Sequence, residues 1–566
     1  MVRVATSVNP SAHPSRSWAR AAAGILGIAL VVTLAFFLDL GRPDFWDPGE
    51  SRYVETVREM GISGNWLEPT LGFVNYYDKP PGFFWMVGSA FALFGRTEWA
   101  ARLPSAVASV LTIALLVGFA WRRVGWRAAI GAGVILATAA QFVALGRSVR
   151  MDMVLTLLTT ATLLQGFVLC ERVTASRPPT WPLYALPIAG LLIKGPVAVL
   201  LPAMVIVPFL LFTRTRPSLA RRRPGWGPVQ VLGLVVGWYG VAAVRAPDYL
   251  WTFLWQHNVG RFVGRALAGH QEPIFFFLWI LPLTFLPWTF FLPGAFQYAL
   301  RRARRQNPLA TFLLAWCVVP FVFFSLSRAK LATYLLPIFP ALALLVAVYV
   351  DRVVRAPAAT RARAFRFPAL AWSLGMTAIA LGTPIGVAIA YPSFVRAALV
   401  TVPLGIFALA GVYCIRNARW QAIPLLVAGA ALTTQILFYR VGTPVVNEFS
   451  SFRTAAELAR DLPAATTIYA YKTRGHSFTY YGERTVLRVR SPEAAAEMLS
   501  RAQPTAVLVK TRHLEMIRQH LTRPVCIWWQ GPAGRAMVAN LPRPSAPAGA
   551  RLAPPTASAD DRTPNC

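Results

Sequence analysis

Acidic residues are scarce in this chain of 566 residues, which has 23 Asp and Glu against 56 Lys and Arg. Charged residues of both signs make up only 14% of the sequence, whereas 56% of it is apolar. This balance excludes an ordinary water-soluble domain and is typical of a polytopic membrane protein. The formal net charge of +33 would also suit a nucleic-acid-binding protein. The basic residues stand in short clusters between apolar runs, however, so we expect no nucleic-acid partner.

Cysteine is also rare, and its pattern excludes further classes. The five cysteines are scattered without a CxxC pair, which argues against a metal cluster and against a disulfide framework. The first apolar run, about residues 21–40, follows basic residues but has no small-residue cleavage pattern. It therefore predicts a retained signal anchor.

Long apolar runs are plentiful, and thirteen of them predict transmembrane helices. They lie near 21–40, 103–121, 128–146, 153–170, 181–194, 196–213, 228–244, 274–298, 309–326, 331–350, 368–391, 399–415 and 422–439. Another run, at 83–95, is too short to span a membrane comfortably. It predicts a helix along the membrane interface, followed by a second short amphipathic piece with the sequence RTEWAARL.

The arginine clusters set the orientation. If residues 1–20 are cytoplasmic, every strong cluster between the thirteen runs falls on the cytoplasmic side, as the positive-inside rule requires. Counting 83–95 as a span would place RRVGWR and RTRPSLARRRP outside. The predicted fold class is therefore mostly α, with about 13 transmembrane helices within 21–440 and interfacial helices in a first outer loop at 41–102. The inner (plasma) membrane is the expected location, with the active face extracytoplasmic.

The sequence changes character after Phe438. The strand-like runs TIYAYK, TVLRVR, AVLVKT and VCIWWQ alternate with helical patterns. They predict a small α/β extracytoplasmic cap domain at 441–542. Residues 543–566 are rich in Pro, Ala, Ser and Asp and predict a disordered tail. A cap without an activity of its own is favoured over an independent activity.

Polar and aromatic residues concentrate in the first outer loop. Residues 44–81 read DFWDPGESRYVETVREMGISGNWLEPTLGFVNYYDKPP and hold seven of the 23 acidic residues. Charges on so apolar a chain cost solvation free energy unless they stay wet or pair and line a cleft. We interpret this loop as the site of function.

The loop sequence, followed by FGRTEWAARLPS, resembles the first outer loop of the C-class membrane glycosyltransferases. The aminoarabinose lipid A transferases are the nearest branch, and the protein O-mannosyltransferases are more distant. The stretches LLIKGPVAVLLP (191–202), HNVGRFVGRALAGHQEPIFFFLWILPLTFLPW (257–288) and SRAKLATYLLP (327–337) agree in order and spacing, so the resemblance covers about 20–350. It implies an enzyme that takes a monosaccharide from a polyprenyl phosphate carrier at the outer face. The acceptor would be a lipid, a glycan or a protein, and the anomeric centre would be inverted.

A lipid-linked donor has an anionic head at the membrane surface, so cations are needed at the outer ends of helices. The candidates for substrate binding are Arg52, Tyr53, Lys79, Arg147, Lys194, Arg328, Lys330 and Tyr334. In the family, the lysine of the xKPP motif, here Lys79, and basic groups near SxxK help to hold the carrier phosphate. The alternative for each side chain is a residue that only reaches to the membrane interface.

Asp47, Glu50 and Asp152 are the predicted catalytic acids, since transfer to a hydroxyl acceptor needs a base. The family carries an Asp-Glu pair before xRY. Glu50 matches the glutamate, but Gly49 stands at the position of the usual aspartate. Either Asp47 or Glu50 takes the acidic role, or an anionic acceptor needs no base, or activity is lost. Asp152 matches a second family acid, and its alternative role is a buried ion pair with Arg52 or a lysine.

Asp78 and His270 form a predicted metal site. In the family, a histidine in this region can share a divalent metal with the acid before KPP, and zinc suits a His/Asp pair. The alternative is a loop histidine bonded to a carboxylate, while His257 is expected to be structural.

Two rival functions remain open at this stage. One is a transporter or flippase of lipid-linked sugars, which the absence of an internal repeat disfavours. The other is a non-catalytic scaffold with a transferase-like fold, which Gly49 makes conceivable.

Overall fold

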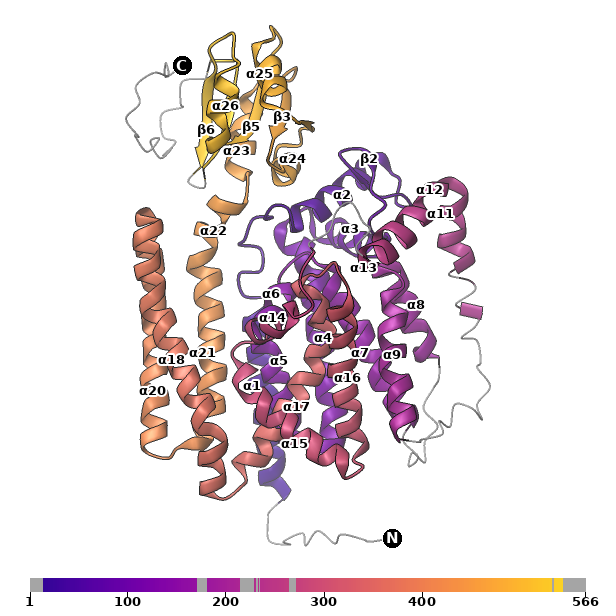
Figure 1. Ribbon diagram of the computed structural model, residues 1–566, viewed down its shortest axis with the longest axis vertical. Helices are drawn as coiled ribbons and strands as arrows, with labels where there is room; N and C mark the ends of the chain where they lie inside the picture. The colour runs from indigo at the N-terminus through magenta and orange to yellow at the C-terminus, as the bar shows by residue number, and fades with distance from the viewer. Residues whose placement is uncertain are drawn as a thin grey trace. The chain divides into compact units, whose positions relative to one another are not determined.

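Long apolar helices make up most of the chain (Figure 1). The computed structural model describes residues 14–170, 181–213, 229–230, 233, 235–263, 271–531 and 534–542. The predicted disordered tail at 543–566 and the first residues of the predicted cytoplasmic N-terminus lie outside this range.

Eight helical segments of the described chain are long and apolar enough to cross a membrane. They are Ala19–Phe36, Glu98–Val124, Met151–Cys170, Pro308–Leu326, Ala332–Val354, Ala358–Ala390, Leu399–Arg416 and Trp420–Ser450. Two bent helix pairs raise the number to ten if each counts as one span: Trp126–Thr138 with Ala140–Gly146, and Phe276–Thr284 with Trp288–Arg304. The chain is therefore a multi-pass membrane protein.

The predicted number of thirteen spans is not reproduced. The runs at 181–194 and 196–213 are the helices α8 (Pro182–Lys194) and α9 (Val197–Thr213), which have 13 and 17 residues and contain internal prolines. Helix α8 ends at Lys194 because Gly195 adopts a positive φ and Pro196 follows it, and a proline cannot continue a helix. The run at 228–244 falls partly outside the described residues, and its described part is a π-helical turn followed by α11 (Gly240–Arg245).

The short run at 83–95 forms helix α3 (Gly82–Phe94), which has 13 residues. The predicted second amphipathic piece after it is wrong, because helix α4 runs without a break from Glu98 to Val124. The Thr97 hydroxyl accepts a hydrogen bond from the Ala100 N–H at 3.2 Å and so caps this helix. The polar first turns and the apolar run therefore form one continuous helix, and Pro104 inside it does not break it.

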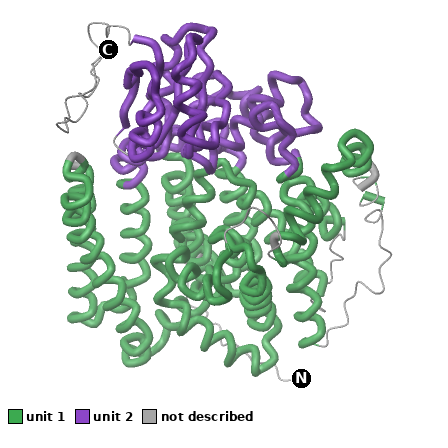
Figure 2. Tube along the Cα trace, turned by 45° about the horizontal axis from the view of Figure 1, so that its top comes forward, with its two compact units in different colours: residues 1–38, 78–80, 105–437 green, residues 39–77, 81–104, 438–566 purple. Residues whose placement is uncertain are grey.

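The described chain divides into two units (Figure 2). Unit 1 comprises residues 1–38, 78–80 and 105–437, and unit 2 comprises residues 39–77, 81–104 and 438–566.

Small residues allow the helices of unit 1 to approach closely. Helix α5 (Trp126–Thr138) packs against α1 (Pro14–Phe36) and α17 (Phe339–Val354). A Cβ atom on Gly133 would stand 2.1 Å from Ile28 Cδ1, so a larger residue here would require the Ile28 side chain to move. Packing through small residues is the usual way in which helices associate in a membrane.

Unit 2 contains a five-stranded sheet with the strand order β4-β3-β5-β7-β6. Its strands are β3 (Thr467–Tyr471), β4 (Val486–Val489), β5 (Thr505–Lys510), β6 (Cys526–Gly531) and β7 (Arg535–Ala539). Strand β3 runs parallel to β4 and β5, whereas β7 is antiparallel to both β5 and β6. The four predicted strands are confirmed, while β7 is a fifth strand that the sequence analysis does not anticipate.

The sheet is covered on both faces, so its central strand β5 is apolar from residue 506 to residue 509. Ala506 and Leu508 of β5 belong to one core cluster, and Val507 and Val509 belong to the other. This alternation follows from the two-residue period of a strand. One cluster includes residues of α23 (Arg453–Leu458) and α24 (His476–Gly482), and the other includes residues of α25 (Pro492–Ser500) and α26 (Leu514–Arg518).

The first outer loop belongs to the same unit as the sheet. Helix α2 (Glu50–Ser63) packs against both α3 and α24. The fully buried Phe45 ring meets Tyr480 edge-on at 5.0 Å and stacks on Tyr481 at 5.9 Å. Unit 2 therefore combines two segments that are about 400 residues apart in the sequence.

The cysteines include one in a disulfide, Cys526 of β6, although the sequence argues against a disulfide framework. Cys170, Cys317 and Cys414 are free and buried.

Candidate functional site

A cavity of about 500 Å³ lies in unit 1, and its wall is mostly apolar. Leucine, valine and phenylalanine side chains from α7 (Met151–Cys170), α9 and α16 (Pro308–Leu326) line it. The polar side chains in the lining are Lys79, Asp152, Lys194, His257, Asn258, Ser327, Thr333 and Tyr334. Four of these, Lys79, Asp152, Lys194 and Tyr334, are residues that the sequence analysis singles out.

An ion pair between two helix ends lies in this cavity. Asp152 stands in the first turn of α7 (Met151–Cys170), and Lys194 is the last residue of α8. The Lys194 ammonium is 2.6 Å from Asp152 Oδ1 and lies over the Tyr334 ring at 5.7 Å from its centroid. An acid at a helix N-terminus and a cation at a C-terminus both interact favourably with the helix dipole. The predicted pairing of Asp152 with a lysine is thus observed.

The turn after α8 is what holds Lys194 in place. Gly195 has φ +88° and ψ −155°, a region that is essentially open to glycine alone. A Cβ atom on Gly195 would also stand 2.4 Å from Phe253 Cζ. Both the backbone angle and the available space therefore require glycine directly after the lysine.

Asp78 is the centre of a second cluster of charged side chains. It belongs to unit 1 together with Lys79 and Pro80. Its Oδ1 atom is 2.9 Å from His257 Nδ1 and 3.4 Å from Lys79 Nζ. His257 lies in a π-helical segment, Trp251–Gly260, and such segments are frequent at functional sites. The expectation that His257 is structural stays a prediction, and its side chain also lines the cavity.

The predicted metal site remains a prediction. His270 lies outside the described residues, and within the described ranges no three His, Cys, Asp or Glu side chains are grouped to hold a metal ion. Asp78 has His257 as its observed histidine neighbour.

Lys330 and Arg328 stand at a corner beside the cavity but not in its lining. The Lys330 ammonium is buried and donates to the carbonyl oxygens of Glu272, at 2.8 Å, and Ser327. Burial lowers the pKa of Lys330, and the charge of Glu272 raises it to a smaller extent. Arg328 is exposed, and its carbonyl oxygen accepts from the Glu272 N–H. The observed contacts of Lys330 therefore hold this corner together.

Arg147 also makes contacts to the backbone. It is buried, and its guanidinium donates to the carbonyl oxygens of Ala35 at 2.8 Å and Leu38 at 2.6 Å. The last carbonyls of a helix have no partner within the helix, and here Arg147 supplies one at the end of α1. Arg147 does not line the cavity described above.

Glu50, in unit 2, forms a buried ion pair with Arg102. The two carboxylate oxygens accept from Arg102 Nε at 2.9 Å and Nη2 at 2.7 Å. The remaining donors of Arg102 reach the carbonyl oxygens of Leu40, Pro43 and Asp44. All five N–H groups of this arginine are thus used, and Glu50 is held as part of a rigid network.

Arg52 and Tyr53 follow Glu50 on α2. The Arg52 guanidinium lies 5.4 Å from the centroid of the Tyr53 ring and 5.7 Å from that of Tyr76. Both distances fit cation–π contacts. Tyr53 itself is buried.

Asp47 is bound by serine residues of unit 2. Its carboxylate accepts from the Ser51 hydroxyl at 2.6 Å and from both the backbone N–H and the hydroxyl of Ser477. Burial raises the pKa of Asp47 to about 6, although these hydrogen bonds act in the opposite direction.

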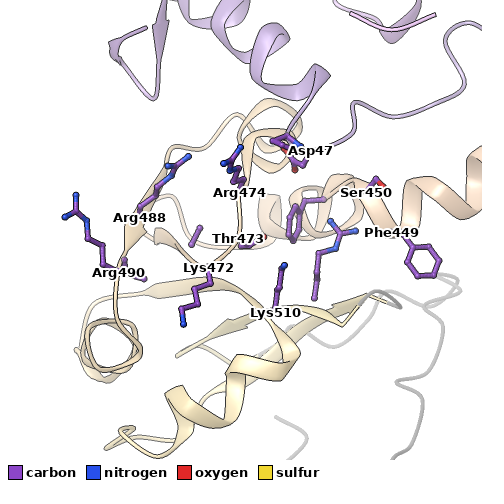
Figure 3. A pocket seen from close by; sticks show the side chains of 14 residues that line it. Asp47, Phe449, Ser450, Lys472, Thr473, Arg474, Arg488, Arg490 and Lys510 are labelled. Atoms are coloured by element: carbon purple, nitrogen blue, oxygen red, sulfur yellow. The ribbon is translucent and has the colours of Figure 1, made fainter. Parts of the chain in front are cut away.

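Asp47 also borders a second pocket, which we call the basic pocket (Figure 3). It has a volume of about 860 Å³, and six cations line it. They are Lys472, Arg474, Arg488, Arg490, Lys510 and Arg535. This pocket is not among the features predicted from the sequence. The signal that could have found it is a basic residue at or just after the end of three predicted strands.

Comparisons with known proteins match this chain to a family model over part of its length and to several curated relatives. The family described as dolichyl-phosphate-mannose-protein mannosyltransferase matches residues 78–239. An undecaprenyl phosphate-alpha-4-amino-4-deoxy-L-arabinose arabinosyl transferase of Edwardsiella ictaluri is 32% identical over 441 residues, which cover 73% of this chain and 78% of that protein. A relative of the same name from Proteus mirabilis is 33% identical over 336 residues, which cover 58% of this chain and 59% of that protein. The chain thus spans less than two thirds of the length of the Proteus protein.

Solved structures show the fold. The crystal structure of ArnT from Cupriavidus metallidurans bound to undecaprenyl phosphate superposes with a TM-score of 0.75 at 24% identity, covering 92% of this chain and 99% of that one. Its apo state gives a TM-score of 0.76 at 23% identity, covering 92% and 98%.

Proposed function

The chain belongs to the family of undecaprenyl phosphate-alpha-4-amino-4-deoxy-L-arabinose arabinosyl transferases, and from this premise we propose that it is a membrane glycosyltransferase. It transfers a monosaccharide from a polyprenyl phosphate carrier to an extracytoplasmic acceptor. By the names of its relatives, the donor is undecaprenyl phosphate-α-4-amino-4-deoxy-L-arabinose. The acceptor is a lipid A-like lipid.

The cavity of unit 1 is the observation that carries this proposal. Its apolar wall suits a polyprenyl chain, while Lys79 and Lys194 supply the cations that a phosphate needs. A site that combines both features fits an amphiphile with an anionic head better than it fits a soluble sugar nucleotide.

The reaction breaks the bond between the anomeric carbon and the phosphate oxygen, which leaves with the bonding electron pair. The acceptor oxygen attacks the anomeric carbon from the opposite side, and the configuration inverts. Lys79 and Lys194 stabilise the charge that develops on the leaving phosphate. If the acceptor is a hydroxyl, its proton goes to a carboxylate, and if the acceptor is an ionised phosphate, no proton moves.

The three predicted acids take different roles in this proposal. Asp152 is the acid of the carrier site, where it positions Lys194. Glu50 is a positioning residue, because Arg102 occupies both of its oxygens. Asp47 is the third proposed catalytic acid, and its raised pKa near 6 suits a group that accepts a proton.

The orientation rests on the arginine clusters. We place the protein in the inner membrane, with the first outer loop and the cap domain of residues 441–542 outside, because the clusters between the apolar runs would then all be cytoplasmic. A membrane-impermeant maleimide should label a single cysteine introduced at the exposed Thr522 in whole spheroplasts, and labelling only after lysis would reverse the orientation.

The enzymatic test uses membranes that contain the full chain and a radiolabelled undecaprenyl phosphate sugar. We expect Lys79→Gln and Lys194→Gln each to lower the rate of transfer on the order of 100-fold, as for the loss of one transition-state donor. Arg355→Gln is the matched control, since this exposed arginine pairs with Asp351 and does not line the cavity. If both lysine variants transfer sugar at the wild-type rate with an unchanged donor KM, the proposal is wrong.

A further inference from the structure

A groove of about 980 Å³ lies in unit 1 between helices α4 and α7. Helix α7 packs closely against α8 and α9, whereas within the described residues α4 is not among its close neighbours. The two helices meet through the rings of Phe119 and Phe167, whose centroids are 5.6 Å apart. Beside this contact their side chains leave a gap, which we call the α4–α7 groove.

The wall of the α4–α7 groove is apolar along most of its length. Leu111, Ala114 and Leu115 of α4 line it, at the spacing that places residues on one face of a helix. Leu157 and Ala161 of α7 belong to the opposite wall. The three α4 residues are exposed, so in a membrane hydrocarbon must cover them. This wall suits an acyl chain.

One end of the groove is basic. Arg122 and Arg123, in the last turn of α4, complete its lining there together with Trp121. The Arg123 guanidinium lies 4.1 Å from the centroid of the Phe119 ring and 5.7 Å from that of Phe167. Both distances fit cation–π contacts, which hold Arg123 beside the point where the two helices meet.

Arg122 is more exposed than Arg123. In the part of the chain that the structure describes, no carboxylate lies within ion-pair distance of the Arg122 guanidinium, and this group makes no hydrogen bond. An arginine at the edge of an apolar wall is costly to dehydrate unless an anion pairs with it. The ligand that fits both the wall and Arg122 is therefore an apolar chain with an anionic head.

The α4–α7 groove is distinct from the cavity that contains Lys194. Pro182, at the start of α8, lines the groove, whereas Lys194, at the end of α8, lines the cavity. The two positions are roughly 18 Å apart along the helix axis, at 1.5 Å per residue. In the proposed orientation, Lys194 is at the outer end of α8 and the groove arginines are on the cytoplasmic side.

We propose that the α4–α7 groove binds an anionic glycerophospholipid, with an acyl chain along the apolar wall and the phosphate on Arg122 and Arg123. Basic pockets between transmembrane helices are typical binding sites for anionic lipid heads. The planar fork of an arginine matches two oxygens of a phosphodiester, and the Trp121 indole suits the depth of a head group. The leaflet that supplies the lipid rests on the proposed orientation, whereas binding itself does not.

The test uses the delipidated full chain in detergent and native mass spectrometry with added phosphatidylglycerol or phosphatidylcholine of identical acyl chains. We expect the wild type to bind phosphatidylglycerol about tenfold more tightly, because only this lipid has a net negative charge. Arg122→Gln should remove most of this preference and leave phosphatidylcholine binding unchanged. The Arg122 side chain is exposed, so this variant keeps the fold. Equal affinities of the wild type for the two lipids would overturn the proposal.

Arg416→Gln is the matched control. Arg416 is an exposed arginine at the end of another apolar helix, α20 (Gly405–Arg416), and it does not line the groove. Its variant should keep the wild-type preference for phosphatidylglycerol. If Arg416→Gln loses the preference as fully as Arg122→Gln does, the lipids respond to the overall charge of the protein and the proposal is overturned.

Ala114→Phe tests the apolar wall. Ala114 is exposed, so a phenylalanine ring can occupy the groove without displacing buried side chains. This variant should weaken phosphatidylglycerol binding about tenfold, since excluding two methylene groups of the chain already costs that much. If it binds phosphatidylglycerol like the wild type while Arg122→Gln does not, Arg122 contacts lipid heads outside the groove and the proposal is overturned.

Two further probes separate other sources of phosphate. Glycerol 3-phosphate should not bind, because it lacks the acyl chain, and binding as tight as that of phosphatidylglycerol would overturn the proposal. If undecaprenyl phosphate displaces phosphatidylglycerol at equal concentration, the groove is a second carrier site and the proposal is likewise overturned. None of these measurements depends on sugar transfer, so a failure of the proposed function would leave the lipid site standing.

Discussion

Some site residues can be predicted from the sequence, whereas the partners of others cannot. Lys79, Asp152, Lys194 and Tyr334 stand at the ends of apolar runs, and the structure brings them to one cavity. Position relative to a membrane is readable from a sequence because hydropathy reports it directly. The partner of Glu50 is not readable, since Arg102 is 52 residues away and no local pattern links the two.

The Glu50–Arg102 pair leads to the first prediction. Arg102→Ala should destabilise the protein by about 3–5 kcal/mol, because it leaves a buried carboxylate unpaired. Glu50→Gln should also lower the midpoint of thermal unfolding, measured by tryptophan fluorescence of the purified protein in detergent. Arg96→Ala, at an exposed arginine of the same segment, should leave the midpoint unchanged. Equal midpoints for all three variants would show that the network does not stabilise unit 2.

The ionisation of Asp47 should make the affinity of the basic pocket for anions depend on pH. Because burial raises its pKa to about 6, the carboxyl is neutral below that pH and the pocket is more positive. The neighbouring arginines and lysines stay charged, and His476 stays neutral because burial and nearby arginines lower its pKa to about 4. Inorganic sulfate keeps its charge over this range, so its affinity should rise as the pH falls from 8 to 5. Asp47→Asn should bind sulfate more tightly at pH 8 and abolish the dependence, and an unchanged slope would contradict this assignment.

The same ionisation affects stability in a definite direction. The pKa of Asp47 is raised above its unfolded value of 3.8, so the folded state holds the proton more strongly. This contribution to stability is present at low pH and is lost as the pH rises from about 4 to about 6.

At the scale of secondary-structure elements, the length of an apolar run predicts helices well but predicts membrane spans poorly. The long runs are largely helical in their described parts, yet α8 and α9 have fewer residues than a membrane span needs. Helix α4 starts earlier than expected, because the cap at Thr97 joins a polar piece to an apolar one. Caps and prolines decide helix ends, and a hydropathy window averages over both.

The prediction at this scale concerns Gly195, in the turn between α8 and α9. Gly195→Ala should lower kcat/KM for the lipid-linked donor by roughly 10- to 100-fold, since displacing Lys194 by a fraction of an ångström misplaces the phosphate. The backbone strain alone costs about 1–3 kcal/mol. Phe253→Ala in the same chain should relieve the clash but not the strain, and so should restore activity only in part. Gly118→Ala is the control, because a Cβ atom there meets nothing within 4 Å.

At the scale of the whole molecule, the division of the chain into units is the feature that the sequence predicts least well. The membrane domain, the first outer loop and the cap read as consecutive parts, whereas the structure joins residues 39–77 and 81–104 to the C-terminal sheet. Contacts such as Phe45 with Tyr480 connect positions more than 400 residues apart, and they depend on side-chain fit rather than on any local pattern.

Because the first outer loop and the C-terminal sheet share a core, a destabilising substitution in the loop should also destabilise the cap. Phe45 is fully buried, so Phe45→Ala should cost about 3–5 kcal/mol through the cavity that it leaves. Because the ring packs on Tyr480 and Tyr481, limited proteolysis should then cut within residues 438–542 as well as within the loop. Phe73→Ala is the matched control, since this loop phenylalanine is 52% exposed and its loss should change neither cleavage pattern. If Phe45→Ala exposes only the loop to protease, the two segments unfold separately and unit 2 is not one cooperative body.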